Sequence, residues 1–186
     1  GRVKTGQLVL SIAAGTTIAM IENHLGGGLS VVRSMPNTPA LVGHGITGAF
    51  AGEHCSDRQR QQAAEVLGAA SEVVWLKDES LMDAVTAISG TGPAYFFLLA
   101  EILAAAAREM GIPAATADRL ASITCFGAGA MLAGSPGDAV ELRRRVTSPG
   151  GTTQAAMDVM KSEGFRKIVL KAAEAARKRS IELSGE

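Results

Sequence analysis

The chain has 186 residues, of which 47% are hydrophobic and 4% aromatic, and its 18 basic and 18 acidic side chains give a formal net charge of zero. This length allows one large domain or two small ones, and the neutral charge balance argues against nucleic acid or an anionic membrane as a partner. The two cysteines, Cys55 and Cys125, lack the spacing of metal ligands or of a disulfide framework. We therefore expect a cytoplasmic protein with no metal site, no nucleic-acid partner and no membrane partner.

Residues 1–76 predict alternating strands and helices. Short apolar runs predict strands at 7–13, 29–35, 45–52 and 71–76. Helices are expected at 18–25 and 56–70. The residues that can cap their first turns are Thr16 or Thr17 for the first helix and Ser56 or Asp57 for the second. This order of elements is typical of an α/β domain and predicts a mostly parallel sheet wrapped by helices.

From residue 77 onward the pattern predicts helices only, at 93–111, 113–134, 138–146, 152–162 and 165–183. Pro93 suits a first helical turn, and Asp138 is expected to cap the third of these helices. The helix at 93–111 is apolar on nearly all sides, so it needs a larger core than this half can provide. An intertwined homodimer is the simplest source of that core. We place the domain boundary between residues 76 and 77, which gives domains 1–76 and 77–186.

The stretch TSPGGTTQ, residues 147–154, combines hydroxyls, a proline and two glycines immediately before a helix. Gly150 and Gly151 allow a ligand to approach the main chain closely. The amides of the helix that starts near Thr152 lie at the positive end of its dipole, so this loop suits a carboxylate. An ordinary helix cap after a tight turn explains the pattern equally well.

Two strands end in small or rigid residues, SIAAG at 11–15 and SMPNTPA at 34–40. In a parallel α/β sheet, ligands bind at the carboxyl ends of the strands, although both stretches also fit plain exits from strand to loop. The segment AVTAISGTGPAY, residues 84–95, is rich in glycine at a helix junction. Gly90 and Gly92 permit either a close helix crossing or the approach of a ligand. The segment is not a P-loop, because the lysine and the preceding strand are missing.

No arrangement of acidic, basic or nucleophilic side chains predicts catalysis by the protein alone. Surface or structural roles are expected for the three histidines, none of which has an acidic partner at a suggestive spacing: His24, His44 and His54. Arg145 ends a basic run and fits either a solvated face or a ligand contact beside the loop. A site made of glycines, hydroxyls and helix starts fits chemistry that a cofactor supplies.

Four motifs, in this order along the chain, resemble pyrroline-5-carboxylate reductases: SIAAG at 11–15, RSMPNTPA at 33–40, DAVTAISGTGPAY at 83–95 and VTSPGGTT at 146–153. The last of these resembles the signature of that family. The resemblance implies the C-terminal part of a Rossmann-like domain that binds NADPH or NADH, followed by an all-helical dimerisation domain. It also implies reduction of the C=N bond of 1-pyrroline-5-carboxylate to L-proline, the last step of proline biosynthesis, by a homodimer or by a decamer built from dimers.

The resemblance further implies roles for individual residues. The substrate carboxylate would be bound by Ser148, Gly151, Thr152 and Thr153. Thr86 would be the catalytic residue near the ring nitrogen, and Glu79 would lie on the substrate side. The cofactor would be bound by Ile12, Ala13, Ala14, Pro36, Asn37 and Arg145, the last of which would approach from the partner chain.

The chain departs from the family at its start, where a glycine-rich dinucleotide fingerprint is expected. No G-x-G-x-x-G follows a predicted strand, so the pyrophosphate-binding turn and the residues that select NADPH over NADH are missing. We therefore expect weak or no dinucleotide binding and no turnover by this chain alone, and the alternative function is a non-catalytic dimerisation module. A hydroxyacid dehydrogenase is disfavoured because residues 84–95 contain no lysine.

Overall fold

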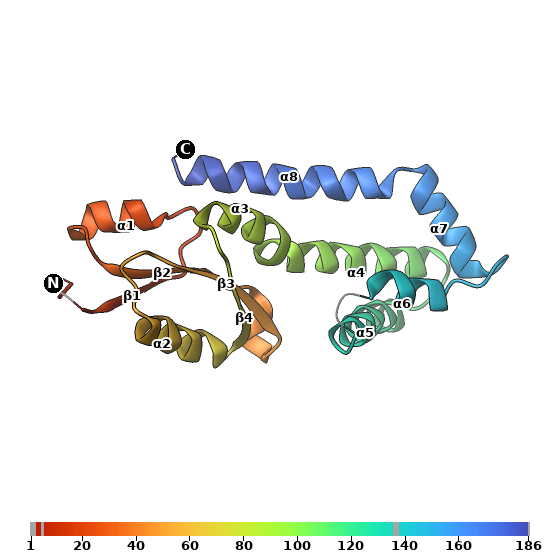
Figure 1. Ribbon diagram of the computed structural model, residues 1–186. Coiled ribbons are helices and arrows are strands. Elements are labelled where there is room, and N and C mark those ends of the chain that lie inside the picture. The colour runs from red at the N-terminus through yellow and green to blue at the C-terminus, as the bar shows by residue number, and fades with distance from the viewer. Residues whose placement is uncertain (1–2, 5, 136–137, 186) are drawn as a thin grey trace. The chain divides into compact units, whose positions relative to one another are not determined.

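The computed structural model describes residues 3–4, 6–135 and 138–185. Within this part, the chain forms two compact units (Figure 1). The sheet unit consists of the residues up to Pro93 together with the residues from Ala172 onward, and the helical unit consists of Ala94–Lys171. These units are defined by contacts within the structure and do not test the predicted domain boundary between residues 76 and 77, which stays a prediction.

A mixed four-stranded sheet forms the centre of the sheet unit, with the strands in the order β1, β2, β3, β4. Their bounds are β1 Leu8–Ser11, β2 Ser30–Met35, β3 Gly45–Ala51 and β4 Ser71–Trp75. The pairs β1–β2 and β3–β4 are parallel as predicted, but β2 and β3 are antiparallel. The reason is the short connection between them, which contains only the 3-10 turn η1, Thr38–Val42, and cannot make the crossover that a parallel pair needs.

Two helices cover opposite faces of this sheet (Figure 1). Helix α1, Ile18–Leu25, packs over Val31, and helix α2, Asp57–Gly68, packs over Val32. Successive strand residues point to opposite faces, so these two neighbouring valines supply one apolar side chain to each core. Both caps fall within the predicted alternatives, because Thr17 caps α1 and Ser56 caps α2 through a reciprocal capping box with Gln59.

A helical run begins soon after β4, earlier than the sequence predicts. It consists of the 3-10 turn η2, Glu79–Leu81, helix α3, Met82–Val85, the π turn η3, Thr86–Gly90, and helix α4, Gly92–Glu109. Glycine and threonine lower the helix propensity of this segment, which is why the pattern indicates helix only from Pro93. Tertiary packing overrides that preference, since Met82 and Ala87 are fully buried.

The remaining helices follow the prediction to within about two residues. Their bounds are α5 Ala114–Ala133, α6 Ala139–Arg145, α7 Thr152–Ser162 and α8 Phe165–Leu183. Asp138 occupies the predicted N-cap position of α6, but its side chain forms no capping hydrogen bond.

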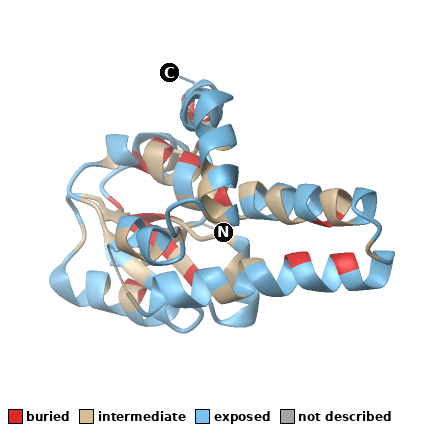
Figure 2. Cartoon of the chain, turned by 90° about the vertical axis from the view of Figure 1, so that its right-hand side faces the viewer, coloured by how far each residue is buried: buried red, intermediate tan, exposed pale blue. Residues whose placement is uncertain are grey.

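Small side chains fill the interior of the helical unit. The buried residues among those described there are Ala104, Ala117 and Ala121. The large apolar side chains of α4 and α5 are exposed instead, for example Phe97, which is 67% exposed, and Phe126. Figure 2 shows that exposed positions run along much of each helix. This agrees with the predicted need for a core larger than one copy of this region supplies.

The end of α8 belongs to the sheet unit. There the hydroxyl of Ser180 donates a 2.6 Å hydrogen bond to Oδ1 of the buried Asp83 in α3. The backbone of Leu183 lies against Gly15, the residue that leads from β1 toward α1. Two distant parts of the sequence therefore complete the packing around the carboxyl end of β1.

Candidate functional site

The strands β1 and β2 end at the same edge of the sheet because they are parallel. The hydroxyl of Ser34 in β2 donates a 2.8 Å hydrogen bond to the carbonyl oxygen of Ser11, the last residue of β1. Beyond Ser11 the chain leaves the sheet, and Ile12 is 64% exposed. Ala13 and Ala14 are exposed as well. Three consecutive apolar residues predicted to bind the cofactor thus lie at the carboxyl edge, where ligands bind in α/β sheets.

Gly15 then turns the chain toward α1 in a left-handed conformation, with φ +71°. It is buried against the end of α8, and a Cβ at this position would lie 3.0 Å from the Cβ of Leu183 and 3.1 Å from its carbonyl carbon. Thr17 caps α1, because its hydroxyl accepts a hydrogen bond from the amide of Met20. The segment 12–14 is therefore followed by a turn that both α8 and α1 hold in place.

Asn37 follows β2, and both the nitrogen and the oxygen of its side-chain amide form hydrogen bonds within the sheet unit. Its Nδ2 donates a 3.2 Å hydrogen bond to the carbonyl oxygen of Ser89, and its Oδ1 accepts a 3.0 Å hydrogen bond from the amide of Ile46. Pro36 beside it is half-buried. Asn37 thus links the π turn η3 to β3, and the cofactor-binding roles of Pro36 and Asn37 stay predictions.

Glu79 connects three segments through one oxygen atom. Its Oε1 accepts hydrogen bonds from Nη1 of Arg33 and from the amide of Ile18, both at 2.9 Å. Arg33 lies in β2 and is only 3% exposed. No role for Arg33 was predicted from the sequence, although a charged residue inside an apolar strand is itself a signal, because a buried charge needs a partner. The substrate-side role of Glu79 stays a prediction.

Thr86 lies where the helical run changes from α3 to the π turn. Its hydroxyl donates a 3.0 Å hydrogen bond to the carbonyl oxygen of Met82. Its own carbonyl oxygen accepts hydrogen bonds from the amide and the hydroxyl of Thr91, at 2.8 and 3.0 Å. Turns of this kind are frequent at functional sites. Since the hydroxyl proton is already donated, the Thr86 oxygen is oriented to accept a hydrogen bond from a ligand.

The loop before α7 closes into a tight turn. The amide of Gly151 donates a 3.0 Å hydrogen bond to the carbonyl oxygen of Ser148, and Gly150 has φ +71°. Gly151 occupies the N-cap position of α7, and no side chain caps the helix. The first amides of α7, beginning at Thr152, are therefore available to a ligand at the positive end of the helix dipole.

The hydroxyls of this loop are not used as a cap either. On either side of them, the Thr147 hydroxyl donates a hydrogen bond to the carbonyl oxygen of Arg143, and the Gln154 amide donates one to Asp158. Within the described part of the chain, the hydroxyls of Ser148, Thr152 and Thr153 have no protein partner. Free amides and free hydroxyls thus occur together at one helix start, which is the donor set that a carboxylate requires.

Arg145, the last residue of α6, is paired within its own helix. Its Nε donates a 2.9 Å hydrogen bond to Oε1 of Glu141, and Arg144 binds the same carboxylate at 2.6 and 2.7 Å. The hydrogen bonds from Arg144 and then Arg145 hold the pKa of Glu141 below its ordinary value. The cofactor contact of Arg145 stays a prediction.

The predicted site residues fall into two sets, one in each unit. The sheet unit carries Ile12, Ala13, Ala14, Pro36, Asn37, Glu79 and Thr86. The helical unit carries Arg145, Ser148, Gly151, Thr152 and Thr153. Among the residues that the structure describes, no group of three or more His, Cys, Asp or Glu side chains could hold a metal ion.

Three glycines have the spacing G-x-G-x-x-G but do not form a dinucleotide turn. They are Gly43, which precedes strand β3, and Gly45 and Gly48, which lie within that strand, so no helix follows them directly. A Cβ at Gly45 would lie 2.6 Å from Ala40, and one at Gly48 would lie 2.6 Å from Val85. Packing of neighbouring backbone and side chains therefore explains these two glycines.

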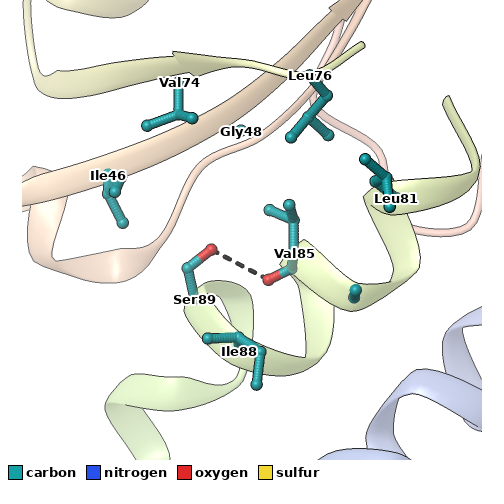
Figure 3. Close-up of a pocket in the computed structure, with 9 residues that line it drawn as sticks. Ile46, Gly48, Val74, Leu76, Leu81, Val85, Ile88 and Ser89 are labelled. Atoms are coloured by element: carbon teal, nitrogen blue, oxygen red, sulfur yellow. Dashed lines mark hydrogen bonds between the residues drawn. The ribbon is translucent and has the colours of Figure 1, made fainter. Parts of the chain in front are cut away.

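An apolar pocket of about 340 Å³ lies between β3, β4 and the helical run of the sheet unit (Figure 3). Its lining consists of Ile46, Gly48, Val74, Leu76, Leu81, Ala84, Val85, Ile88 and Ser89. The Ser89 hydroxyl donates a 3.0 Å hydrogen bond to the Val85 carbonyl oxygen, and the lining includes no charged side chain. The pocket thus lacks the donors that a carboxylate needs.

The helical run from Glu79 to Glu109 is long and apolar enough to cross a membrane, judged by length and composition alone. One such helix is weak evidence for a membrane span, because the core helix of a soluble protein and a signal sequence pass the same test. Phe96, Phe97 and Ile102 on this run are exposed. Exposed apolar side chains of this kind are typical of contact surfaces.

The comparisons with known proteins agree on one family. The model described as "Pyrroline-5-carboxylate reductase dimerisation" matches residues 79–183, more than half of the chain. A pyrroline-5-carboxylate reductase of Pseudomonas aeruginosa is 47% identical over 182 residues, which are 98% of this chain and 67% of that relative. The reductase of Haemophilus influenzae is 42% identical over 178 residues, 95% of this chain and 66% of the relative. The chain thus spans about two thirds of the length of these curated relatives.

Solved structures give the same result. A pyrroline-5-carboxylate reductase of Coxiella burnetii matches with a TM-score of 0.90 and 42% identity, covering 95% of this chain and 66% of that one. The pyrroline carboxylate reductase of Plasmodium falciparum, solved with NADP bound, matches with a TM-score of 0.88 and 29% identity, covering 97% of this chain and 72% of that one. These matches confirm the predicted fold class, the C-terminal part of a Rossmann-like domain followed by an all-helical domain. The chain belongs to the pyrroline-5-carboxylate reductase family.

Proposed function

We propose that this chain is the substrate-binding and dimerisation part of a pyrroline-5-carboxylate reductase, an oxidoreductase that reduces the C=N bond of 1-pyrroline-5-carboxylate to give L-proline. The observation that carries the proposal is the start of α7, where Gly151 leaves the first amides uncapped beside unpaired hydroxyls. Family membership supports the reaction, because the relatives that this chain matches are named for it.

The start of α7 would bind the substrate carboxylate. The amides that follow Gly151, together with the hydroxyls of Ser148, Thr152 and Thr153, can donate charge-assisted hydrogen bonds to its two oxygens. The helix dipole adds a favourable field for a negative charge at this position. Binding at the carboxylate fixes one end of a five-membered ring and thereby restricts the positions of its C=N bond.

Thr86 would contact the ring nitrogen. Its hydroxyl proton is donated to Met82, so the oxygen can accept the N–H of a protonated imine. A hydrogen bond accepted from the charged form stabilises that form, and a protonated imine is the better hydride acceptor. When hydride adds to the ring carbon, the electron pair of the C=N bond moves to nitrogen and leaves a neutral amine. Thr86 therefore orients the nitrogen and needs no strong acid beside it.

The residues at the carboxyl edge of the sheet fit the nicotinamide end of NADPH or NADH, which supplies the hydride when bound. Ile12, Ala13 and Ala14 are small or apolar and exposed, as a flat ring requires. Gly15 lets this segment turn away tightly against α8. The pyrophosphate-binding turn has no counterpart among these residues, so the fit concerns the nicotinamide end alone.

A homodimer is the proposed assembly. The exposed apolar side chains of α4 and α5 support it, as does the match of residues 79–183 to a dimerisation model, which also supports a domain boundary close to residue 77. A decamer built from dimers would require additional contacts between dimers and is distinguished by molecular mass. We further propose a cytoplasmic location, which the free thiols of Cys55 and Cys125 support.

A non-catalytic dimerisation module is the second candidate. It is favoured by one observation, the absence from the sequence of a glycine-rich turn between a strand and a helix. This candidate predicts the same dimer and the same fold but no binding of L-proline at α7.

Amide chemical shifts of the chain titrated with L-proline test the proposal. We expect saturable shifts that are largest at residues 151–154. The same experiment with pyrrolidine, which has the ring but no carboxylate, should give no shifts there. A reductase assay of the complete gene product with NADPH and NADH then measures turnover. Saturable L-proline binding elsewhere, or none at all, contradicts the proposed role of α7.

A further inference from the structure

A buried cation lies in the strand next to the proposed cofactor segment. Arg33 is 3% exposed, and its Nε is buried without a hydrogen-bond partner. Its ion pair with Glu79 joins Nη1 to Oε1 at 2.9 Å. Burying two charges costs several kcal/mol before their attraction is counted, and apolar residues of similar volume often serve stability as well or better. Stability alone is therefore a weak explanation for this pair.

The Glu79 carboxylate has a second contact, with the start of α1. Its Oε1 accepts a 2.9 Å hydrogen bond from the amide of Ile18, the first residue of that helix. This amide has no partner within the helix and lies at the positive end of its dipole. A single carboxylate oxygen thus accepts hydrogen bonds from both the buried guanidinium of Arg33 and the first amide of α1.

These contacts connect the two parts of the proposed site in the sheet unit. Ile18 follows the segment 12–14 through the turn at Gly15. Glu79 begins the helical run that carries Thr86, seven residues or about two helical turns further on. Arg33 lies directly across from Ser11 in the register of β1 and β2. A shift of the Glu79 carboxylate would therefore change the separation of Thr86 from the cofactor segment.

We propose that Arg33 and Glu79 are positioning residues of the reductase reaction, which set the distance between Thr86 and the segment 12–14. This inference rests on the proposed function. It gives Glu79 a role that acts through Arg33 and Ile18, because its Oε1 accepts hydrogen bonds from both of them. Misplacement of reacting groups by about 1 Å can lower a rate on the order of 100-fold.

Steady-state kinetics of the complete gene product test the role. Glu79→Gln keeps an oxygen that can accept from Ile18 but removes the charge that faces Arg33. We expect kcat to fall at least about tenfold while KM for 1-pyrroline-5-carboxylate changes less than about threefold, because the carboxylate site at α7 is untouched. A rise in KM with kcat unchanged would instead make Glu79 a substrate-binding residue and would overturn the proposal. The matched control is Asp118→Asn, which breaks the exposed ion pair with Arg108 in the helical unit and should leave both constants unchanged.

The double variant Arg33→Met/Glu79→Gln separates positioning from stability. It removes the unpaired buried charge, so its free energy of unfolding should recover relative to Glu79→Gln. Its kcat should stay as low as that of Glu79→Gln. Recovery of kcat together with stability would overturn the positioning role, since the pair would then act only on folding.

Hydrogen exchange of the Ile18 amide tests its hydrogen bond to Glu79 independently of reductase activity. We expect faster exchange at Ile18 in Glu79→Ala than in Glu79→Gln, with exchange in the core strand β3 unchanged. Equal exchange at Ile18 in Glu79→Ala, Glu79→Gln and the unsubstituted protein would overturn the contact itself. If the unsubstituted gene product had no reductase activity, the proposed function would fail. Activity with a normal kcat in Glu79→Gln would overturn the positioning role alone.

Discussion

The hydroxyl of Ser180 lies 2.6 Å from Oδ1 of Asp83, and both residues are buried although 97 positions separate them in the chain. This hydrogen bond ties the last turns of α8 to α3, one turn before Thr86. Since α8 also contacts Gly15, the C-terminal end of the chain supports both sides of the proposed site in the sheet unit.

Replacing Ser180 by alanine should destabilise the sheet unit. The substitution leaves a buried carboxylate without its hydroxyl partner, which costs about 1–3 kcal/mol in the free energy of unfolding. Urea denaturation followed by the fluorescence of Trp75 measures it. Ser162→Ala is the control, because that hydroxyl is exposed and bonds only to Val159 in its own helix. Equal stability of the two variants would show that Asp83 finds another partner.

Gly15→Ala should weaken the contact between the end of α8 and the turn that follows β1. The positive φ costs about 1–2 kcal/mol for a residue with a Cβ, and the close approach to Leu183 adds to that strain. Gly27→Ala separates the two effects, since Gly27 has φ +74° but an added Cβ would meet nothing within 4 Å. We expect the larger loss of stability at Gly15, measured by thermal unfolding. A similar loss at both positions would argue that Leu183 moves aside freely.

Thr153→Ala should weaken the binding of proline-like carboxylates to the complete gene product by about 1 kcal/mol or more, because a charge-assisted hydrogen bond is lost. Isothermal titration with L-proline gives the affinity. Thr124→Ala on the exposed surface of α5 is the matched control and should bind normally. Unchanged affinity in Thr153→Ala would indicate that the Thr153 hydroxyl does not bind the carboxylate and that the loop serves only as the start of α7.

This chain by itself should bind NADPH weakly or not at all and should produce no proline. The physical reason is that no glycine-rich turn presents helix amides to a pyrophosphate. Titration of the purified chain with NADPH, followed by cofactor fluorescence, tests the first part, and a reductase assay tests the second. Robust NADPH-dependent formation of proline by the purified chain would refute this expectation.

The free energy of unfolding should decrease at alkaline pH through Cys55. Burial raises the pKa of this thiol above its ordinary value of 9.0, so the folded state favours the protonated form. That contribution is complete below the ordinary pKa and is lost as the pH rises through the raised one. Unfolding of Cys55→Ala at a series of pH values should show a shallower alkaline decrease than the parent chain. Cys125→Ala provides the comparison, and the same slope in all three proteins would speak against the assignment.

Sequence reasoning predicted the elements well where a local signal is strong. The strands at 29–35 and 45–52 and the helix capped by Ser56 were found because apolar runs and caps depend on neighbouring residues alone. It missed the helical turns at 79–90, where local propensity opposes a helix and burial of Met82 decides the conformation. The predicted mostly parallel sheet is confirmed for β1–β2 and β3–β4, while the antiparallel pairing of β2 with β3 depends on how the connection between them folds.

For the site, the sequence by itself determined which residues stand at strand exits and at the start of α7, because glycines, prolines and hydroxyls act on the backbone within a few residues of themselves. Only the tertiary structure decided that Glu79 meets Arg33 and Ile18 and that Ser180 meets Asp83. Such contacts join residues up to 97 positions apart, and no local pattern encodes them. They arise because buried charges and polar groups must find partners when distant segments pack together.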